Sequence, residues 1–343
     1  MAKIAIIGLG LIGGSMGLAL KRAKLTNTEV VGFDRDPQVA ARALKAGAIQ
    51  SAAPTLQQAV SRATIIIVAT PILSVRKVFE EIAPHLQRNA IVTDTASTKQ
   101  EVMRWAQEIL PEGVHFVGGH PMAGKEKSGP QAAEESLFDG RPYVLIPSVS
   151  AGGGAVQAVQ TLAQTIGAEP TFLDAAEHDT YAAAISHLPL VASMALFSLA
   201  RASLAWPELG NMAGPAFRDF TRLASGEPEM SHDIFLTNRV EVLHWLDRYV
   251  AELQRLAELI SSDDSEALFR AIAETQMDRE AFLSSPPVRE TPGPGLELPG
   301  QLDSFMSQMA GVLWQQRASE ITQDLEERSR QRQREERLRR RED

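Results

Sequence analysis

The chain has 343 residues, of which 44% are apolar, so it is long enough to bury a sizeable core and to form two domains. It contains no cysteine, which excludes a disulfide framework, a thiolate nucleophile and a zinc site built on thiolates. Its 34 basic and 43 acidic side chains give a net charge of −9, an unfavourable balance for binding the phosphates of a nucleic acid.

The N-terminal half alternates between short β-branched runs and helical stretches. Uninterrupted apolar runs of this kind are typical of strands in a parallel sheet that helices cover on both faces. We predict a first domain over residues 1–174, with strands at residues 3–8, 29–34, 64–70, 90–94, 115–119, 143–147 and 170–174.

Strand patterns largely vanish after Asp174, and an Ala- and Leu-rich helical pattern follows over residues 175–201 with a break at Pro189. Further helices are expected near residues 230–261 and 265–284. Apolar residues recur at helical spacing in the first of these and predict a broad buried stripe: Val242, Leu243, Leu246, Val250, Leu253, Leu256 and Ile260. Residues 175–284 are therefore predicted to form a second, all-helical domain.

The C-terminal part changes in composition. Residues 285–300 hold five Pro and three Gly, which predicts a linker. A helix and a charged tail are expected over residues 301–343, either solvated or docked on a second subunit. No apolar run approaches the ~20 residues of a membrane span. The start shows no signal-peptide pattern, so we expect a cytoplasmic protein with no membrane partner.

A G-x-G-x-x-G turn links the first expected strand to a helix, with Gly8, Gly10 and Gly13 as its glycines and Leu11 and Ile12 between them. The first glycine allows a tight turn, the second lets the backbone approach a pyrophosphate, and the third lets the helix pack close to the strand. The pyrophosphate would then face the positive end of the helix dipole.

An acidic residue follows at the expected distance, because Asp34 ends the second expected strand 21 residues after Gly13. A carboxylate there can accept hydrogen bonds from both ribose hydroxyls of an adenosine. It should also repel a 2′-phosphate, so NAD is favoured. Arg35 keeps NADP open, since a guanidinium can hold a phosphate. The predicted fold class is an α/β Rossmann-like domain with a mostly parallel sheet, followed by an all-α domain.

Two polar segments follow later strands of this sheet, where open α/β sheets bind their ligands. In residues 93–99, Ser97 is a candidate catalytic hydroxyl, although Ser97 or Thr98 could instead cap a helix. In residues 118–126, His120 follows a Gly pair and is suited to accept a hydroxyl proton as hydride leaves the same carbon.

The helical domain carries further candidates. His187 lies in an otherwise apolar helix and is equally compatible with a core position and a site position. Arg218 and Arg222 are four residues apart, which would place them on one helical face as a carboxylate clamp, or as surface partners of nearby acids. The remaining histidines have no spacing that suggests a metal, so no metal site is expected.

Six segments together resemble the prephenate/arogenate dehydrogenase family of tyrosine biosynthesis, over roughly residues 3–284. They are GLGLIGGS at 8–15, TP at 70–71, DTASTK at 94–99, GGHPMAGKEKSG at 118–129, ISHLP at 185–189 and GPAFRDFTR at 214–222. Members of this family pass a hydride from the hydroxyl-bearing ring carbon of a cyclohexadienol to NAD(P)+. The ring carboxylate leaves as carbon dioxide while the ring becomes aromatic.

The resemblance implies roles for particular residues. His120 would take the hydroxyl proton, Ser97 would orient His120, substrate and nicotinamide, and Arg222 would bind the ring carboxylate. Further substrate contacts would come from Arg218, His187 and Glu126, and further cofactor contacts from Leu11, Ile12, Thr70 and Pro71. Family members are usually dimers built through the helical domain, so a homodimer is implied.

Two departures from the family pattern matter. Many prephenate-preferring members carry a second His three positions after the one that matches His187, where this chain has Leu190. This leaves prephenate, arogenate or both as substrates. The residues after 285 also lack the alternating strands and helices of a regulatory domain that some members carry.

Two other interpretations remain open at this point. A β-hydroxyacid or imine dehydrogenase would share the domain order, but it would be expected to use a helix-borne Lys, and the predicted helices after Asp174 contain none. A regulatory protein that senses NAD without turnover would not need His120, Ser97 and two Arg at chemically suitable positions.

Overall fold

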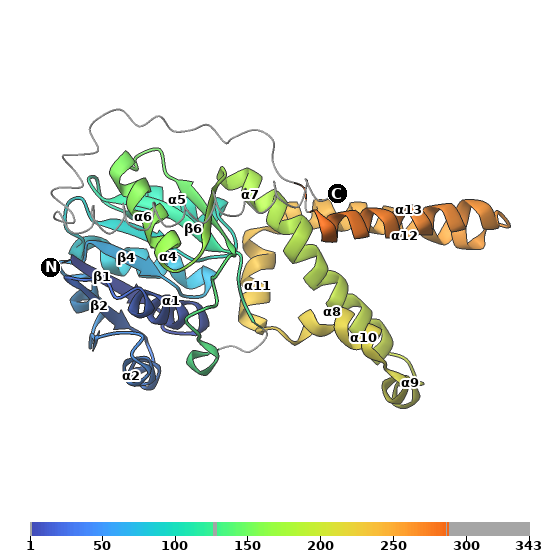
Figure 1. Ribbon diagram of the computed structural model, residues 1–343, viewed down its shortest axis with the longest axis horizontal. Helices are drawn as coiled ribbons and strands as arrows, with labels where there is room; N and C mark the ends of the chain where they lie inside the picture. Colours follow the sequence, from blue (N-terminus) through green and yellow to red (C-terminus); the bar gives the residue numbers. More distant parts are fainter. Residues whose placement is uncertain (1, 126–128, 286, 288–343) are drawn as a thin grey trace, which may run out of the picture. The chain divides into compact units, whose positions relative to one another are not determined.

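The computed structural model describes residues 2–125, 129–285 and 287. These residues divide into two compact units, the first ending at Ala175 and the second beginning at Ala176. The first unit is an α/β domain and the second is helical, which confirms the expected fold class (Figure 1). Glu126, most of the expected linker, and the expected C-terminal helix and tail lie outside the described residues.

The first unit is built on an eight-stranded sheet in the order β3-β2-β1-β4-β5-β6-β7-β8. Only β6 and β7 pair antiparallel; every other neighbouring pair is parallel. All seven expected strands are present, and the two-residue β3 at the edge is the one that the sequence pattern missed. The strands are β1 (Ala2–Ile7), β2 (Thr28–Phe33), β3 (Ser51–Ala52), β4 (Ile65–Val68), β5 (Ile91–Asp94), β6 (His115–Pro121), β7 (Pro142–Pro147) and β8 (Glu169–Phe172).

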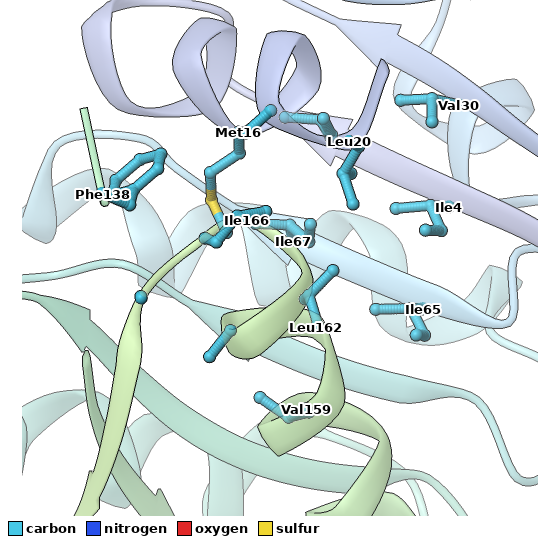
Figure 2. Packing of buried hydrophobic residues seen from close by; sticks show 14 of the residues in the cluster. Ile4, Met16, Leu20, Val30, Ile65, Ile67, Phe138, Val159, Leu162 and Ile166 are labelled. Carbon is cyan, nitrogen blue, oxygen red and sulfur yellow. The ribbon is translucent and has the colours of Figure 1, made fainter. Parts of the chain in front are cut away.

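Helices cover both faces of this sheet. They are α1 (Leu11–Arg22), α2 (Pro37–Ala46), α3 (Leu56–Val60), α4 (Ile72–Ile82), α5 (Gln100–Ile109) and α6 (Gly153–Thr165). On one face, Met16 of α1 and Leu162 of α6 pack in one buried cluster with Ile67 of β4 (Figure 2). On the other, Phe79 of α4 meets Phe116 of β6 edge to face, with ring centroids 5.5 Å apart. Burial on both faces explains why the central strand β4 is apolar throughout rather than alternating.

The second unit consists of helices and short helical turns (Figure 1). It begins with one continuous stretch in which a π-helical segment separates two α-helices. Pro189, which lacks a backbone N–H, lies in the first turn of the second helix, directly after the π-helical segment. The elements are α7 (Ala175–Ala182), η3 (Ala183–His187), α8 (Leu188–Arg201), α9 (Trp206–Met212), α10 (Pro215–Phe220), η4 (Arg222–Ser225), α11 (Pro228–Thr237), α12 (Arg239–Ser261) and α13 (Ser265–Ser284).

The expected buried stripe of α12 is wrong for the single chain. Val242 is buried, but Leu243, Val250, Leu253 and Ile260 are exposed, the last to 70%. Helical spacing identifies the residues that share a face, but it does not say what covers that face. The apolar face of α12 is uncovered within the described residues of this chain.

The stretch Ala175–Arg201 is long and apolar enough to cross a membrane, by length and composition only, with a mean hydropathy of 1.7 in its most apolar window. Within that window 28% of the residues are buried in the fold. A single helix of this kind is weak evidence for a membrane span, because helices that pack against other protein pass the same test.

Candidate active site

The glycine-rich turn has the geometry of a dinucleotide-binding loop. Gly8 has φ of +87°, and a Cβ there would lie 2.4 Å from Ala69 O. A Cβ on Gly13 would lie 1.9 Å from Gly8 O, so only glycine lets α1 start this close to β1. Around Gly10 a Cβ would meet nothing within 4 Å, and no side chain caps the N-terminus of α1 there. The open backbone and the positive end of α1 both favour a bound phosphate.

The carboxylate of Asp34 is held at the end of β2 by two backbone amides. Its Oδ2 accepts from Leu9 N at 2.8 Å, and its Oδ1 accepts from Asp36 N at 2.9 Å. The neighbouring acid has a local role, because Asp36 Oδ1 accepts from Gln38 N at 2.8 Å and caps α2. Asp34 is thus a carboxylate held in place at the end of β2, beside the glycine-rich turn.

A cavity of about 570 Å³ adjoins this loop. Its size suits a cofactor-sized ligand. The predicted cofactor residues that line it are Gly8, Gly10, Asp34, Arg35, Thr70 and Pro71. The other three predicted residues, Leu11, Ile12 and Gly13, do not line it; they form the first turn of α1.

Several cavity residues were not anticipated from the sequence. The helix α4 contributes Ser74, Lys77 and Glu81. Their i, i+3/i+4 spacing after the Thr-Pro pair places them on one side of the helix, and that spacing is the signal that could have found them. The hydroxyl of Thr70 is buried without a hydrogen-bond partner among the described residues, so it is available to a ligand or a water in the cavity.

The two polar segments that follow later strands lie at the same edge of the sheet as the glycine-rich turn. The adjacent strands β1, β4, β5 and β6 are parallel, so their carboxyl ends meet there. His120 is a residue of β6, pairs with Val144 and is only 8% exposed. Ser97 is half-buried in the loop after β5. Lys99 occupies the N-cap position of α5, so neither Ser97 nor Thr98 has that position.

A buried ion pair beside His120 was not predicted. The side chains of Lys99 and Asp94 are both fully buried and form an ion pair with each other. Lys99 Nζ also donates to Gly119 O at 2.7 Å, and Asp94 Oδ1 accepts from Gly119 N at 3.1 Å. Both residues lie in the polar segment 93–99 that the sequence identified. The sequence does not show, however, that the Lys side chain near the end of this strand is buried.

In the helical unit, His187 is fully buried in η3. The side-chain amide of Asn238 donates to Asp179 O at 2.8 Å and lies 3.2 Å from His187 Nδ1. Because an amide nitrogen only donates, Nδ1 is the acceptor and Nε2 carries the hydrogen. Burial lowers the pKa of His187 to about 4; the Asp179 charge opposes this shift and His178 adds to it. Nε2 has no partner among the described residues, so a neutral N–H donor is left over.

The two arginines do not share one helix, so the expectation that they lie on one helical face is wrong; their role as carboxylate binders stays a prediction. Arg218 lies in α10, whereas Arg222 begins the separate 3-10 turn η4. The α-helix ends at Phe220, and its C-cap residue Thr221 donates its hydroxyl to Phe217 O at 2.7 Å. Both arginines are exposed, and Arg218 Nε donates to Ala213 O at 3.1 Å. Glu126 lies outside the described residues. In the part of the chain that the structure describes, no group of three or more His, Asp or Glu could hold a metal ion.

Comparison with known proteins places both units in one family. The family model for the nucleotide-binding domain of prephenate dehydrogenase matches residues 16–171, and the model for its dimerization domain matches residues 174–274. A prephenate dehydrogenase from Bacillus subtilis is 36% identical over 78% of this chain and 72% of its own length. A cyclohexadienyl dehydrogenase from Zymomonas mobilis is 32% identical over 83% of this chain and 98% of its own length.

Solved structures agree with this assignment. The arogenate dehydrogenase of Synechocystis has a TM-score of 0.70 at 31% identity, over 82% of this chain and 99% of that one. A prephenate dehydrogenase from A. aeolicus, solved with hydroxyphenyl propionate and NAD+, has a TM-score of 0.76 at 28% identity, over 82% of this chain and 98% of that one. The chain belongs to the prephenate dehydrogenase family.

Proposed function

We propose that this protein catalyses the NAD-dependent oxidative decarboxylation of prephenate, arogenate or both in tyrosine biosynthesis. Its family supports this function, and one observation carries the assignment to these residues. The imidazole of His120 lies at the same edge of the sheet as the glycine-rich turn, because β1, β4, β5 and β6 run side by side and parallel. A base and a dinucleotide can therefore meet at one substrate carbon.

Bound NAD+ supplies the hydride acceptor for the ring carbon that bears the hydroxyl. His120 takes the hydroxyl proton as that hydride leaves. The bond between the ring and its carboxylate then breaks, carbon dioxide leaves, and the electron pair enters the ring. His120 returns its proton to the resulting phenolate oxygen, so the base is regenerated without an external acid. Aromatisation drives the reaction, and the protein needs only to position the carbon and the proton acceptor.

The remaining site residues have supporting roles in this proposal. The hydroxyl of Ser97 orients His120, and the guanidinium of Arg222 binds the ring carboxylate as a planar fork. Arg218 and Glu126 complete the substrate contacts, as the family resemblance implies. Because His187 is neutral and its Nε2–H has no partner within the described part of the chain, it is suited to donate a hydrogen bond to a substrate oxygen without adding charge.

The cofactor residues favour NAD over NADP. The Asp34 carboxylate accepts hydrogen bonds from two backbone amides, which hold it at the end of β2 where it would face the ribose 2′ position. A 2′-phosphate would meet this fixed negative charge. Arg35 is exposed beside the cavity and could attract the same phosphate. The ratio of the affinities for NAD and NADP therefore tests whether the charge of Asp34 or that of Arg35 dominates.

We further propose a homodimer that forms through the helical domain. The uncovered apolar side chains of this unit include Leu243 and Ile260 of α12 and Phe269 of α13. The stretch Ala175–Arg201 likewise exposes Met194, Phe197 and Leu199. Large exposed apolar side chains in this number favour an interaction site, and a second copy of the same domain would cover them. The cytoplasmic location stays a prediction from the sequence.

The decisive experiment is an assay of purified protein with NAD+ and either prephenate or arogenate, followed by NADH absorbance. We expect turnover with at least one of the two compounds. Absence of turnover with both compounds would refute this function and would favour a hydroxyacid dehydrogenase or a non-catalytic NAD sensor. The position three residues after His187 is the buried Leu190, which leaves the choice between prephenate and arogenate open. The same assay therefore also measures the ratio of kcat/KM for the two compounds.

A further inference from the structure

A lysine and an aspartate form a fully buried ion pair inside the Rossmann-like domain. Lys99 and Asp94 both have fully buried side chains and bind each other directly. Removing two charges from water is costly, and well-packed apolar residues often stabilise a fold as much as a buried pair does. A contribution to stability therefore does not by itself explain why this pair is buried. Its other contacts point to a second role.

The pair holds both backbone polar groups of Gly119, the residue before His120. Lys99 Nζ donates to Gly119 O at 2.7 Å, and Gly119 N donates to Asp94 Oδ1 at 3.1 Å. The glycine is also confined by its neighbours. A Cβ there would lie 2.6 Å from Asp94 O and 2.9 Å from the ring of the fully buried Tyr143. The backbone that carries the His120 imidazole is thus fixed at the end of β6.

The same pair shapes the loop that carries Ser97. Asp94 Oδ2 accepts from Ala96 N at 2.8 Å, on one side of Ser97, and Lys99 anchors the chain on the other. Two charged groups therefore set the backbone beside both Ser97 and His120. Lys99 is fully buried, so it acts on these residues through the backbone rather than as an accessible acid.

We propose that the Asp94–Lys99 pair positions the catalytic residues, because it holds His120 and Ser97 in the relative arrangement that proton transfer needs. This inference rests on the proposed function for its kinetic consequences. Proton abstraction needs a short, aligned contact, and a misplacement of about 1 Å can cost ~10²-fold in rate. The adenosine part of NAD would bind at Asp34, whose carboxylate is held at the end of β2 by Leu9 N and Asp36 N, so its binding should be spared.

The test compares three variants with a matched control. Lys99→Met and Asp94→Asn each remove one charge, and the double variant Asp94→Asn/Lys99→Met removes both. The control is Arg22→Met, which breaks the 2.5 Å ion pair between Arg22 and Asp139 in the same domain. Each protein is assayed for kcat per NAD-binding site, for NAD affinity, and for the pKa of the His120 imidazole by NMR, assigned with His120→Asn.

We expect the double variant to lose roughly 10- to 100-fold in kcat while its NAD affinity stays within about twofold of the parent. The single variants should shift the His120 pKa in opposite directions, since Lys99→Met leaves an anion near the imidazole and raises the pKa, whereas Asp94→Asn leaves a cation and lowers it. In the double variant that shift should be small although kcat stays low. Arg22→Met should match the parent in all three measurements.

Parental kcat per NAD-binding site in the double variant would overturn the proposal. If the charge variants do not fold, Gly119→Ala serves instead, because it displaces the same backbone without changing a charge; parental kcat there would also overturn it. The parent enzyme is assayed first. If it turns over neither substrate, the proposed function fails, and an unchanged His120 NMR spectrum in the double variant would then refute the positioning role separately.

Discussion

The buried imidazole of His187 links the stability of the helical domain to pH. Its pKa is 6.5 in an ordinary environment and is lowered to about 4 in the fold, chiefly by burial. As pH falls below 6.5, the unfolded chain binds this proton while the folded chain does not. The stabilising contribution is therefore fully present above about pH 6.5 and is lost as pH falls towards about 4.

The size of the effect follows from the shift. At ~1.4 kcal/mol per unit of pKa, the full loss is about 3 kcal/mol, of which about 2 kcal/mol should have occurred by pH 5. The assay is urea unfolding at pH 7.5 and pH 5.0 for the parent and for His187→Gln, which cannot titrate. The drop in unfolding free energy should be about 2 kcal/mol larger in the parent. An equal drop in both proteins, or an NMR titration of His187 near pH 6.5, would refute the reasoning.

Four further changes test the proposed site. Gly13→Ala should abolish NAD binding in a fluorescence titration, because its Cβ would lie 1.9 Å from Gly8 O. Asp34→Ala should weaken NAD more than NADP, and equal losses of affinity would remove its ribose role. His120→Asn should lower kcat by ~10²- to 10⁴-fold with NAD affinity unchanged; parental kcat would remove the base assignment. Arg222→Ala should mainly raise KM for the cyclohexadienol through loss of a charge-assisted pair, so a fall in kcat alone would contradict a binding role.

Local patterns in the sequence were sufficient for most of the fold and for the nucleotide loop. Seven strands could be placed because each is an apolar, β-branched run bounded by turns, and β3 was missed because two residues carry no pattern. The positions of Gly8, Gly13 and Asp34 followed from spacing along one strand–helix–strand unit, β1–α1–β2. Their conformations depend on contacts within that unit and with the adjoining Ala69, so a motif of fixed spacing identifies them.

The tertiary structure decided which side chains are buried and what they contact. From the sequence, Lys99 would be expected at the surface. In the fold it is buried against Asp94 and Gly119, because strands that are distant in the sequence meet there. The separation of Arg218 from Arg222 depends on a chain turn that helical spacing does not show. For α12, periodicity identified an apolar face, but only the packing of the whole unit revealed that this face is uncovered in a single chain. Burial is a property of three-dimensional neighbours, which no local pattern contains.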